Sequence, residues 1–270
     1  MCQFCTEHGA GKKWYLAAQN YAQELASSEG RESYIHNFFK NYRNYDKNVR
    51  KVDIARKIPF VRDYVQKKFD TYFNYNHSGQ VISLEDAVTI CAIPGRVSII
   101  DCPCQKYLLN KTEKKCILFG TTSEIVDNIP EFAPVKDIGA EDAAELLKNL
   151  DNSGQVHTVW TFKTPYIGAL CNCNGSGCLM FHLKSRYNSP TVIKKGHEVA
   201  LVDEEICNGC GDCYSICQFN SIFIQDGKAK ISVGCHGCGI CRNSCSQRAI
   251  YLVPRDYNSN SIGINPIEIK

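Results

Sequence analysis

Long apolar runs are missing from this sequence of 270 residues. No stretch approaches the roughly 18 apolar residues that a membrane span needs. The start, Met-Cys-Gln-Phe-Cys, lacks the basic and apolar stretches of a secretory signal. The net charge of +3 is also too small to indicate nucleic acid by itself. We therefore expect a soluble cytoplasmic protein with no membrane span.

Glycine-rich nucleotide motifs are missing as well. The sequence has no dinucleotide-binding glycine turn and no phosphate loop, so neither NAD nor ATP chemistry is expected within this chain. A flavin held without such a motif stays open as a further cofactor.

Cysteine, by contrast, is abundant, with 17 residues. In a small secreted protein this number would indicate a disulfide framework, but this chain is long, has no signal and has an odd cysteine count. Because cytosolic thiols are kept reduced, clustered cysteines here indicate metal ligands or redox groups.

Composition and periodicity divide the chain into four parts and predict an α+β fold. We expect a helical N-terminal region at 1–78 and a mixed α/β middle domain at 79–197. A compact C-terminal unit with short strands at 198–254 and a polar tail at 255–270 complete the chain.

The N-terminal region is basic and aromatic. An early helix is predicted around 14–25, and apolar residues recur at helical spacing through 31–75, on both sides of Pro59. Basic residues interleaved with aromatics are also typical of single-stranded nucleic-acid binding. Since the aromatics fall on the apolar helix faces, we interpret them as core and expect no nucleic acid. The basic face is instead expected to dock an acidic redox partner. The apolar positions are Ile35, Phe38, Phe39, Tyr42, Val49, Val52, Val61, Tyr64, Val65, Phe69, Tyr72 and Phe73.

The middle domain contains a faint repeat. A short helix opened by Ser83, a strand and Cys102-Pro103-Cys104 occur in the same order as a helix at 140–150, a strand and Cys171-Asn172-Cys173. If these are two copies of one unit, pseudo-twofold packing would bring both Cys-x-Cys turns to a shared site.

The C-terminal unit carries two runs of four cysteines with identical spacing, Cys-x2-Cys-x2-Cys-x3-Cys, at a constant offset of 28 residues. Three cysteines on a tight loop can bind three irons of a cubane cluster, while the fourth lies on a helical turn and reaches the other cluster. Glycines between the cysteines leave the backbone free to adopt positive φ. We therefore assign Cys207, Cys210, Cys213 and Cys245 to one 4Fe–4S cluster, and Cys235, Cys238, Cys241 and Cys217 to a second.

This region resembles the bacterial-type dicluster ferredoxins over residues 198–254, which implies their fold and one-electron transfer. One departure is clear, because the family has proline after each fourth cysteine where this chain has Gln218 and Ser246. Each residue restores a backbone N–H that proline lacks. If that N–H points at a sulfur, it would raise the reduction potential.

Zinc is the alternative metal, since four-thiolate zinc sites also use Cys-x2-Cys pairs. Zinc ribbons usually separate their two pairs by a longer loop, which favours iron–sulfur here. A purely structural role for the clusters stays as a second alternative.

Six further cysteines form a second group, for which we predict a metal or redox site. A Cys-x-Cys pair on a turn can bracket one metal or cluster, and Pro103, Asn172 and the glycines at 175 and 177 favour turns. The alternative is that some are merely small buried residues. The predicted ligands are Cys102, Cys104, Cys116, Cys171, Cys173 and Cys178.

The two Cys-x-Cys motifs are similar to those of the catalytic chain of ferredoxin:thioredoxin reductase. In that family they hold a 4Fe–4S cluster against a redox-active disulfide, which implies a disulfide reductase. Here the segment between the motifs is far longer and the family's final Cys-His-Cys is missing. Only Cys102, Cys104, Cys171 and Cys173 match.

Several isolated residues remain. Cys2, Cys5 and His8 could bind a metal or form a loose reducing tail. Cys91, in an apolar stretch, and His157, on a predicted strand, are interpreted as core.

Three functions follow from these patterns. The first is an electron-transfer protein that connects redox partner proteins, with two 4Fe–4S clusters and a possible third. The second is an iron–sulfur oxidoreductase whose active site lies at the Cys-x-Cys turns. The third is a structural subunit whose clusters only brace the fold. The sequence gives neither the donor and acceptor nor the oligomeric state.

Overall fold

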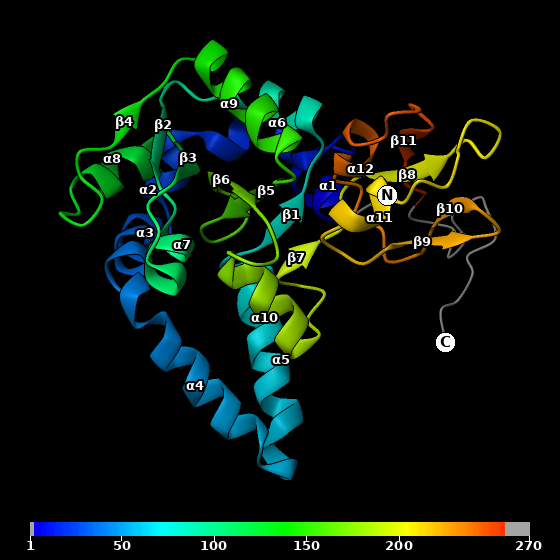
Figure 1. The fold of residues 1–270 in the computed structure, drawn as a ribbon. Helices are drawn as coiled ribbons and strands as arrows, with labels where there is room; N and C mark the ends of the chain where they lie inside the picture. Colours follow the sequence, from blue (N-terminus) through cyan, green and yellow to red (C-terminus); the bar gives the residue numbers. More distant parts are fainter. Residues whose placement is uncertain (1–2, 257–270) are drawn as a thin grey trace.

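A seven-stranded sheet forms the centre of the structure, a computed structural model that describes residues 3–256 (Figure 1). The strand order is β4-β2-β3-β6-β5-β1-β7, and every pairing is antiparallel except that of β1 with β7. The mixed α+β class predicted from the sequence is confirmed. The strands are β1 (Gly79–Val81), β2 (Val97–Asp101), β3 (Lys114–Phe119), β4 (Lys136–Asp137), β5 (Val156–Thr161), β6 (Ile167–Cys173) and β7 (Ile193–Lys194).

Both faces of this sheet are buried, and its central strands β3, β5 and β6 are buried at nearly every position. Side chains alternate between the faces. Cys116 and Leu118 of β3 point into one core, whereas Ile117 and Phe119 point into the other. The first core also receives Trp160 of β5.

Helices cover each face. On the face of Ile117, α6 (Leu84–Cys91) packs beside α9 (Ala140–Asn152), together with α1 (Gln3–His8) and the turn η1 (Trp14–Leu16). Ser83 caps α6 by accepting a hydrogen bond from the Asp86 backbone N–H at 3.4 Å, as the sequence predicted. On the face of Cys116 lie α3 (Arg31–Lys40), α7 (Pro103–Leu109), α8 (Thr121–Asp127) and α10 (Leu179–Tyr187).

The early helix predicted around 14–25 is wrong. That stretch forms the turns η1 and η2 (Ala18–Tyr21) and the short helix α2 (Gln23–Ser27). The backbone is extended at Ala17 and again at Ala22, which ends each turn. Trp14, Tyr15 and Tyr21 are nevertheless buried, because the irregular path sets all three against the sheet.

A long helical hairpin, α4 (Tyr45–Arg56) and α5 (Pro59–Tyr75), projects away from the sheet (Figure 1). Pro59 opens α5 as its first residue, where a missing N–H costs nothing. Near the sheet Phe73 is buried, as predicted, but Tyr64 is 62% exposed. The prediction that the whole apolar stripe is core is therefore wrong, because the hairpin extends beyond the sheet that would cover it.

The C-terminal unit lies beside the large sheet and has a small core of its own. Strand β8 (Glu198–Val202) pairs with β11 (Ile250–Pro254), and β9 (Ile222–Gln225) forms a hairpin with β10 (Lys228–Ile231). Asp226 and Gly227 make the turn of this hairpin with φ values of 51° and 70°. Two short helices, α11 (Asp212–Ile216) and α12 (Ile240–Asn243), complete the unit.

No helix in residues 3–256 has both the length and the apolar character needed to cross a membrane. The predicted tail beyond residue 256, and Cys2 at the other end, lie outside the described residues.

Candidate metal and cysteine centres

Two glycine-containing loops, one in each half of the C-terminal unit, present its cysteines. Gly209 and Gly211 have φ values of 72° and 87°, and Gly237 and Gly239 have nearly the same values, 74° and 86°. Positive φ at these four positions agrees with the sequence analysis. A side chain at Gly209 would collide with the carbonyl of Gly227. A side chain at Gly237 would collide with the carbonyl of Glu198, so both loops pack closely against the neighbouring backbone.

Electrostatic contributions show which thiols lie near Cys213 and Cys238. Burial, followed by the charges of Cys210, Cys245 and Cys207, raises the pKa of Cys213. Burial, with smaller contributions from Cys235 and Cys217, likewise raises the pKa of Cys238 to about 12. The neighbours in each set include the fourth cysteine of the other run, which is the crossed arrangement expected for two cubane clusters.

Backbone N–H groups point at three of these sulfurs. Ser221 donates to Cys217 Sγ, Ala249 to Cys245 Sγ and Ala229 to Cys207 Sγ, each at 3.4 Å. Such bonds stabilise thiolate and the reduced state of a bound cluster.

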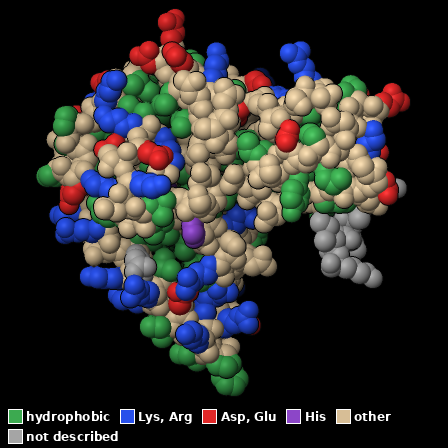
Figure 2. Space-filling model, in the orientation of Figure 1, with side chains coloured by type: hydrophobic (Ala, Val, Ile, Leu, Met, Phe, Trp, Pro, Cys, Tyr) green, Lys and Arg blue, Asp and Glu red, His purple; other side chains and the backbone are tan. Residues whose placement is uncertain are grey.

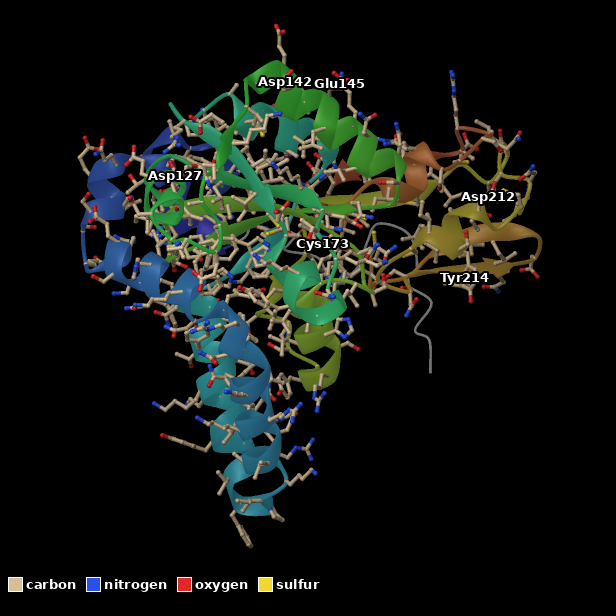
Figure 3. The ribbon with its side chains drawn as sticks, turned by 60° about the vertical axis from the view of Figure 1, so that its left-hand side comes forward. Asp127, Asp142, Glu145, Cys173, Asp212 and Tyr214 are labelled. Carbon is tan, nitrogen blue, oxygen red and sulfur yellow. The ribbon has the colours of Figure 1, made fainter. Side chains whose placement is uncertain are left out.

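The two sets differ in exposure, so we name them the outer set (Cys207, Cys210, Cys213, Cys245) and the inner set (Cys217, Cys235, Cys238, Cys241). In the outer loop Cys210 is exposed and Tyr214 is 59% exposed. The first and third cysteines are buried in both loops, so the difference lies at the second cysteine, since the inner-loop Cys238 is only half-buried. Figure 3 shows Tyr214 at the lower edge of the C-terminal unit.

The inner loop is attached to the large sheet domain by several contacts. Gly196 donates its N–H to the His236 carbonyl at 2.8 Å, and Arg242 bonds Glu85 of α6 at 2.6 Å. Ile240 belongs to the same core as the six middle cysteines, and Cys238 packs against that core. The inner set therefore lies at the junction between the two parts of the molecule.

The structure brings the six middle cysteines together on one face of the sheet. Cys102 is the N-cap residue of α7 and Cys104 lies in its first turn, while Cys178 is the N-cap residue of α10. Cys116 of β3 lies directly opposite Cys171 of β6. The turn predicted at Cys171-Asn172-Cys173 is wrong, since these residues end strand β6. Alternation along the strand still puts both thiols on one side.

The six thiols form hydrogen bonds with one another, so that some sulfurs act as acceptors and other thiols act as donors. Hydrogen bonds from Cys104, Cys116 and Cys173 lower the pKa of Cys102 far below its usual range. Hydrogen bonds from Cys104 and Cys173 do the same for Cys178. Five of the six are buried, and Cys171 is half-buried.

Polar side chains surround this six-cysteine centre. The Tyr42 hydroxyl lies 2.8 Å from Cys104 Sγ, and Lys115, 2% exposed, bonds Glu113 at 3.1 Å. Although burial opposes it, the bond to Glu113 and the charges of Cys173 and Cys102 raise the pKa of Lys115. A buried ammonium therefore accompanies the thiols. Sequence reasoning missed both residues, because nothing in the local pattern marks them.

A polar chain on the opposite face of β6 links this region to the C-terminal unit. Asn172 donates to the Lys115 carbonyl at 2.6 Å and contacts His157 Nδ1 at 2.6 Å. His157 Nε2 lies 3.4 Å from Asp151, which accepts a hydrogen bond from Asn243 of α12. His157 is fully buried, as predicted, but it forms part of this cross-domain chain.

Cys5 does not join the six-cysteine centre. It is buried on α1 in the other core, and its Sγ lies 2.8 Å from His197 Nε2. His8, at the end of the same helix, lies 3.7 Å from Glu7. Cys91 is core, as predicted, and burial raises its pKa to about 12.

The cysteine sets differ in how well they suit a zinc ion and a cubane cluster. The 15 described cysteines other than Cys5 form no disulfide, and residues 3–256 contain no group of three or more His, Cys, Asp or Glu placed to hold a metal ion. A zinc site would draw four sulfurs to about 2.3 Å from one ion. A cubane holds its thiolates at separate corners, so loops with positive φ and N–H groups aimed at sulfur fit it better.

Comparison with known proteins gives one match. The model of the 4Fe-4S binding domain family (Fer4) matches residues 200–223, which contain the first cysteine run. The chain thus has an iron–sulfur region near its C-terminus, with support for at least one 4Fe–4S cluster. Neither a curated protein nor a solved structure matches the chain.

Proposed function

We propose that the chain is an electron-transfer protein with two 4Fe–4S clusters in its C-terminal unit and a further cysteine-based redox centre in the sheet domain. The outer set would hold one cluster and the inner set the other. When bound, such clusters supply one-electron oxidation and reduction. The residues of the middle centre would be Cys102, Cys104, Cys116, Cys171, Cys173 and Cys178.

The different exposure of the two loops carries this proposal. The outer loop presents Cys210, Tyr214 and Ile206 to solvent, where a partner protein can approach. The inner loop is turned toward the six-cysteine centre, and the N–H of Gly175, two residues after Cys173, bonds Gln218, next to Cys217. The three thiol groups therefore follow one another from the surface to the interior.

The size of the middle centre favours an enzyme as the second candidate. Six thiols are two more than one cubane needs, so a cluster and a reactive thiol pair could occupy the same place. Cys171 is the half-buried member of the centre and lies opposite Cys116. A ferredoxin-linked reductase acting at the Cys-x-Cys motifs would use this arrangement.

Iron and acid-labile sulfide per chain, with EPR of the reduced protein after anaerobic purification, test the proposal. About eight irons indicate two clusters with a thiol redox pair, and about twelve indicate three clusters. The double variant Cys171→Ser, Cys173→Ser should remove only the iron of the middle centre. The matched control Cys91→Ser, which alters a buried cysteine outside all three groups, should retain every iron.

Two further results separate the candidates. A cysteine pair that alkylates only after reduction favours the reductase, whereas reversible cluster reduction without such a pair favours the electron carrier. A colourless anaerobic preparation containing zinc would contradict both.

A further inference from the structure

The end of the α4–α5 hairpin exposes several large apolar side chains to solvent. Phe60 is 99% exposed, Ile54 65%, Tyr64 62% and Ile58 49%. Figure 2 shows these hydrophobic side chains at the lower tip of the molecule, where the hairpin ends. Contiguous apolar surface of this kind marks an interaction site in folded proteins.

A basic hollow lies beside this tip. It encloses about 610 Å³ and is lined by five cationic side chains and a single carboxylate. That carboxylate, Asp53, is already engaged by Arg186 at 2.9 Å and by the Tyr187 hydroxyl at 2.9 Å. The lining residues are Arg50, Asp53, Ile54, Arg56, Lys57, Arg62 and Arg186.

Arg56 offers an unused donor in this hollow. Its guanidinium lies over the Tyr187 ring at 4.6 Å, and its Nε is buried without a hydrogen-bond partner among the described residues. A buried donor without an acceptor is costly, and a phosphate oxygen is the partner that a guanidinium prefers. Across 45–75 the sequence has eight Lys and Arg residues against four Asp residues, so the whole hairpin attracts anions.

We propose that this hairpin binds the surface of an anionic lipid bilayer. Phe60, Ile58 and Tyr64 enter the boundary between headgroups and acyl chains, and the basic hollow receives lipid phosphates. Apolar residues on one side and Lys or Arg beside them are the features of helices that lie in the membrane interface. The hairpin lies on the bilayer and does not cross it.

A bilayer explains the shape of this surface better than the acidic protein partner expected from the sequence. Protein interfaces of standard size bury about 800 Å² per partner on matched surfaces. The exposed residues here lie on a narrow convex tip, which a fluid lipid surface accommodates without a matching groove (Figure 2).

Vesicle co-sedimentation of the full-length, iron-loaded protein tests the proposal. The probes are vesicles of phosphatidylcholine alone and of phosphatidylcholine with phosphatidylglycerol at about three to one. We expect binding to the anionic vesicles only, and loss of binding as salt shortens the screening length. Arg56→Gln with Lys57→Gln should weaken binding about 25-fold, at roughly fivefold for each charge.

The tip is tested separately from the charges. Phe60→Ser with Ile58→Ser should weaken binding about tenfold or more through lost apolar burial. Ile224→Ser with Tyr251→Ser is the matched control, since it removes two exposed apolar residues of the C-terminal unit. It should leave binding unchanged, and cluster absorbance reports folding of every variant.

Three outcomes would overturn the proposal. They are no binding to anionic vesicles, equal binding to neutral ones, and a tip variant that binds like the parent protein. Light scattering tests a fourth outcome. If the parent protein is a dimer and the tip variant is a monomer, this surface binds a second copy of the chain and not a bilayer.

Discussion

The backbone N–H of Gly175 donates a hydrogen bond to Gln218 Oε1 at 2.9 Å. Gly175 follows Cys173 of the six-cysteine centre by two residues, and Gln218 follows the inner-set residue Cys217 directly. Gln218 Nε2 in turn donates to the Ile216 carbonyl at 3.2 Å. One side chain therefore joins the segments that carry two different groups of thiols, and it occupies a position where the dicluster ferredoxins have proline.

Gln218→Leu should loosen this junction. The variant removes an acceptor and leaves the Gly175 N–H without its partner, at a cost of about 1 kcal/mol of stability. Anaerobic urea unfolding followed by cluster absorbance measures this cost. The control is Gln247→Leu, at an exposed position whose amide bonds only Ser246 among the described residues. Equal stability of the two variants would show that the bond to Gly175 contributes nothing.

Lys115→Met should lower the reduction potential of the middle centre. Removing a buried ammonium beside Cys102 and Cys173 disfavours the more negatively charged reduced state. A shift on the order of 60 mV corresponds to a tenfold change for one electron. Redox titration followed by EPR measures it, and Lys114→Met, an exposed lysine one residue earlier, is the control. An unchanged reduction potential in Lys115→Met would show that this lysine does not influence the redox centre.

His77 should make the protein acid-sensitive. Burial lowers its pKa to about 4, and its ring stacks on Trp160 with Nδ1 2.9 Å from the Thr161 carbonyl. The unfolded chain, with a pKa near 6.5, therefore binds a proton before the folded chain does. Stability from this group is complete above about pH 6.5 and falls as the pH drops toward 4, by about 2 kcal/mol between pH 7 and pH 5.

Urea unfolding at those two pH values measures the loss. His77→Gln should remove most of the difference, and His182→Gln, which alters an exposed histidine, should retain it. The same pH dependence in both variants would place the acid sensitivity elsewhere.

Gly209→Ala should release the outer cluster selectively. The added Cβ meets the Gly227 carbonyl, and positive φ adds roughly 1–2 kcal/mol of strain. We expect about four fewer irons per chain. Gly211→Ala isolates the effect of φ, since its backbone is equally left-handed but an added Cβ there would meet no atom within 4 Å. Equal loss of iron from both variants would mean that the strain of positive φ, and not the collision with the Gly227 carbonyl, releases the cluster.

The C-terminal unit could be predicted almost completely from the sequence, because its information is local. Cysteine spacing, glycines of positive φ and the Asp226-Gly227 turn act within a few residues of each other. The glycines between the cysteines have the positive φ values that the sequence analysis allows. The Fer4 match covers the first of its two cysteine runs.

The six-cysteine centre could be predicted only in part. The sequence predicts the six cysteines as one group. Which of them lie opposite one another, such as Cys116 and Cys171, depends on the register between strands that are distant in sequence. Lys115 could not be chosen over Lys114, since only the fold shows that Lys115 is buried and Lys114 is exposed. The prediction that the hairpin tip is core is wrong because helical periodicity identifies an apolar stripe but does not show whether another element covers it.

The alternation along β6 limits how the length of this protein can vary during evolution. Cys171 and Cys173 point to one side and Asn172 to the other, so inserting or deleting one residue within the strand would exchange thiols for an amide. Changes of length are tolerable only in the connections outside the strand. Related chains should therefore differ in length outside this strand and keep the interval from Ile167 to Cys173 constant.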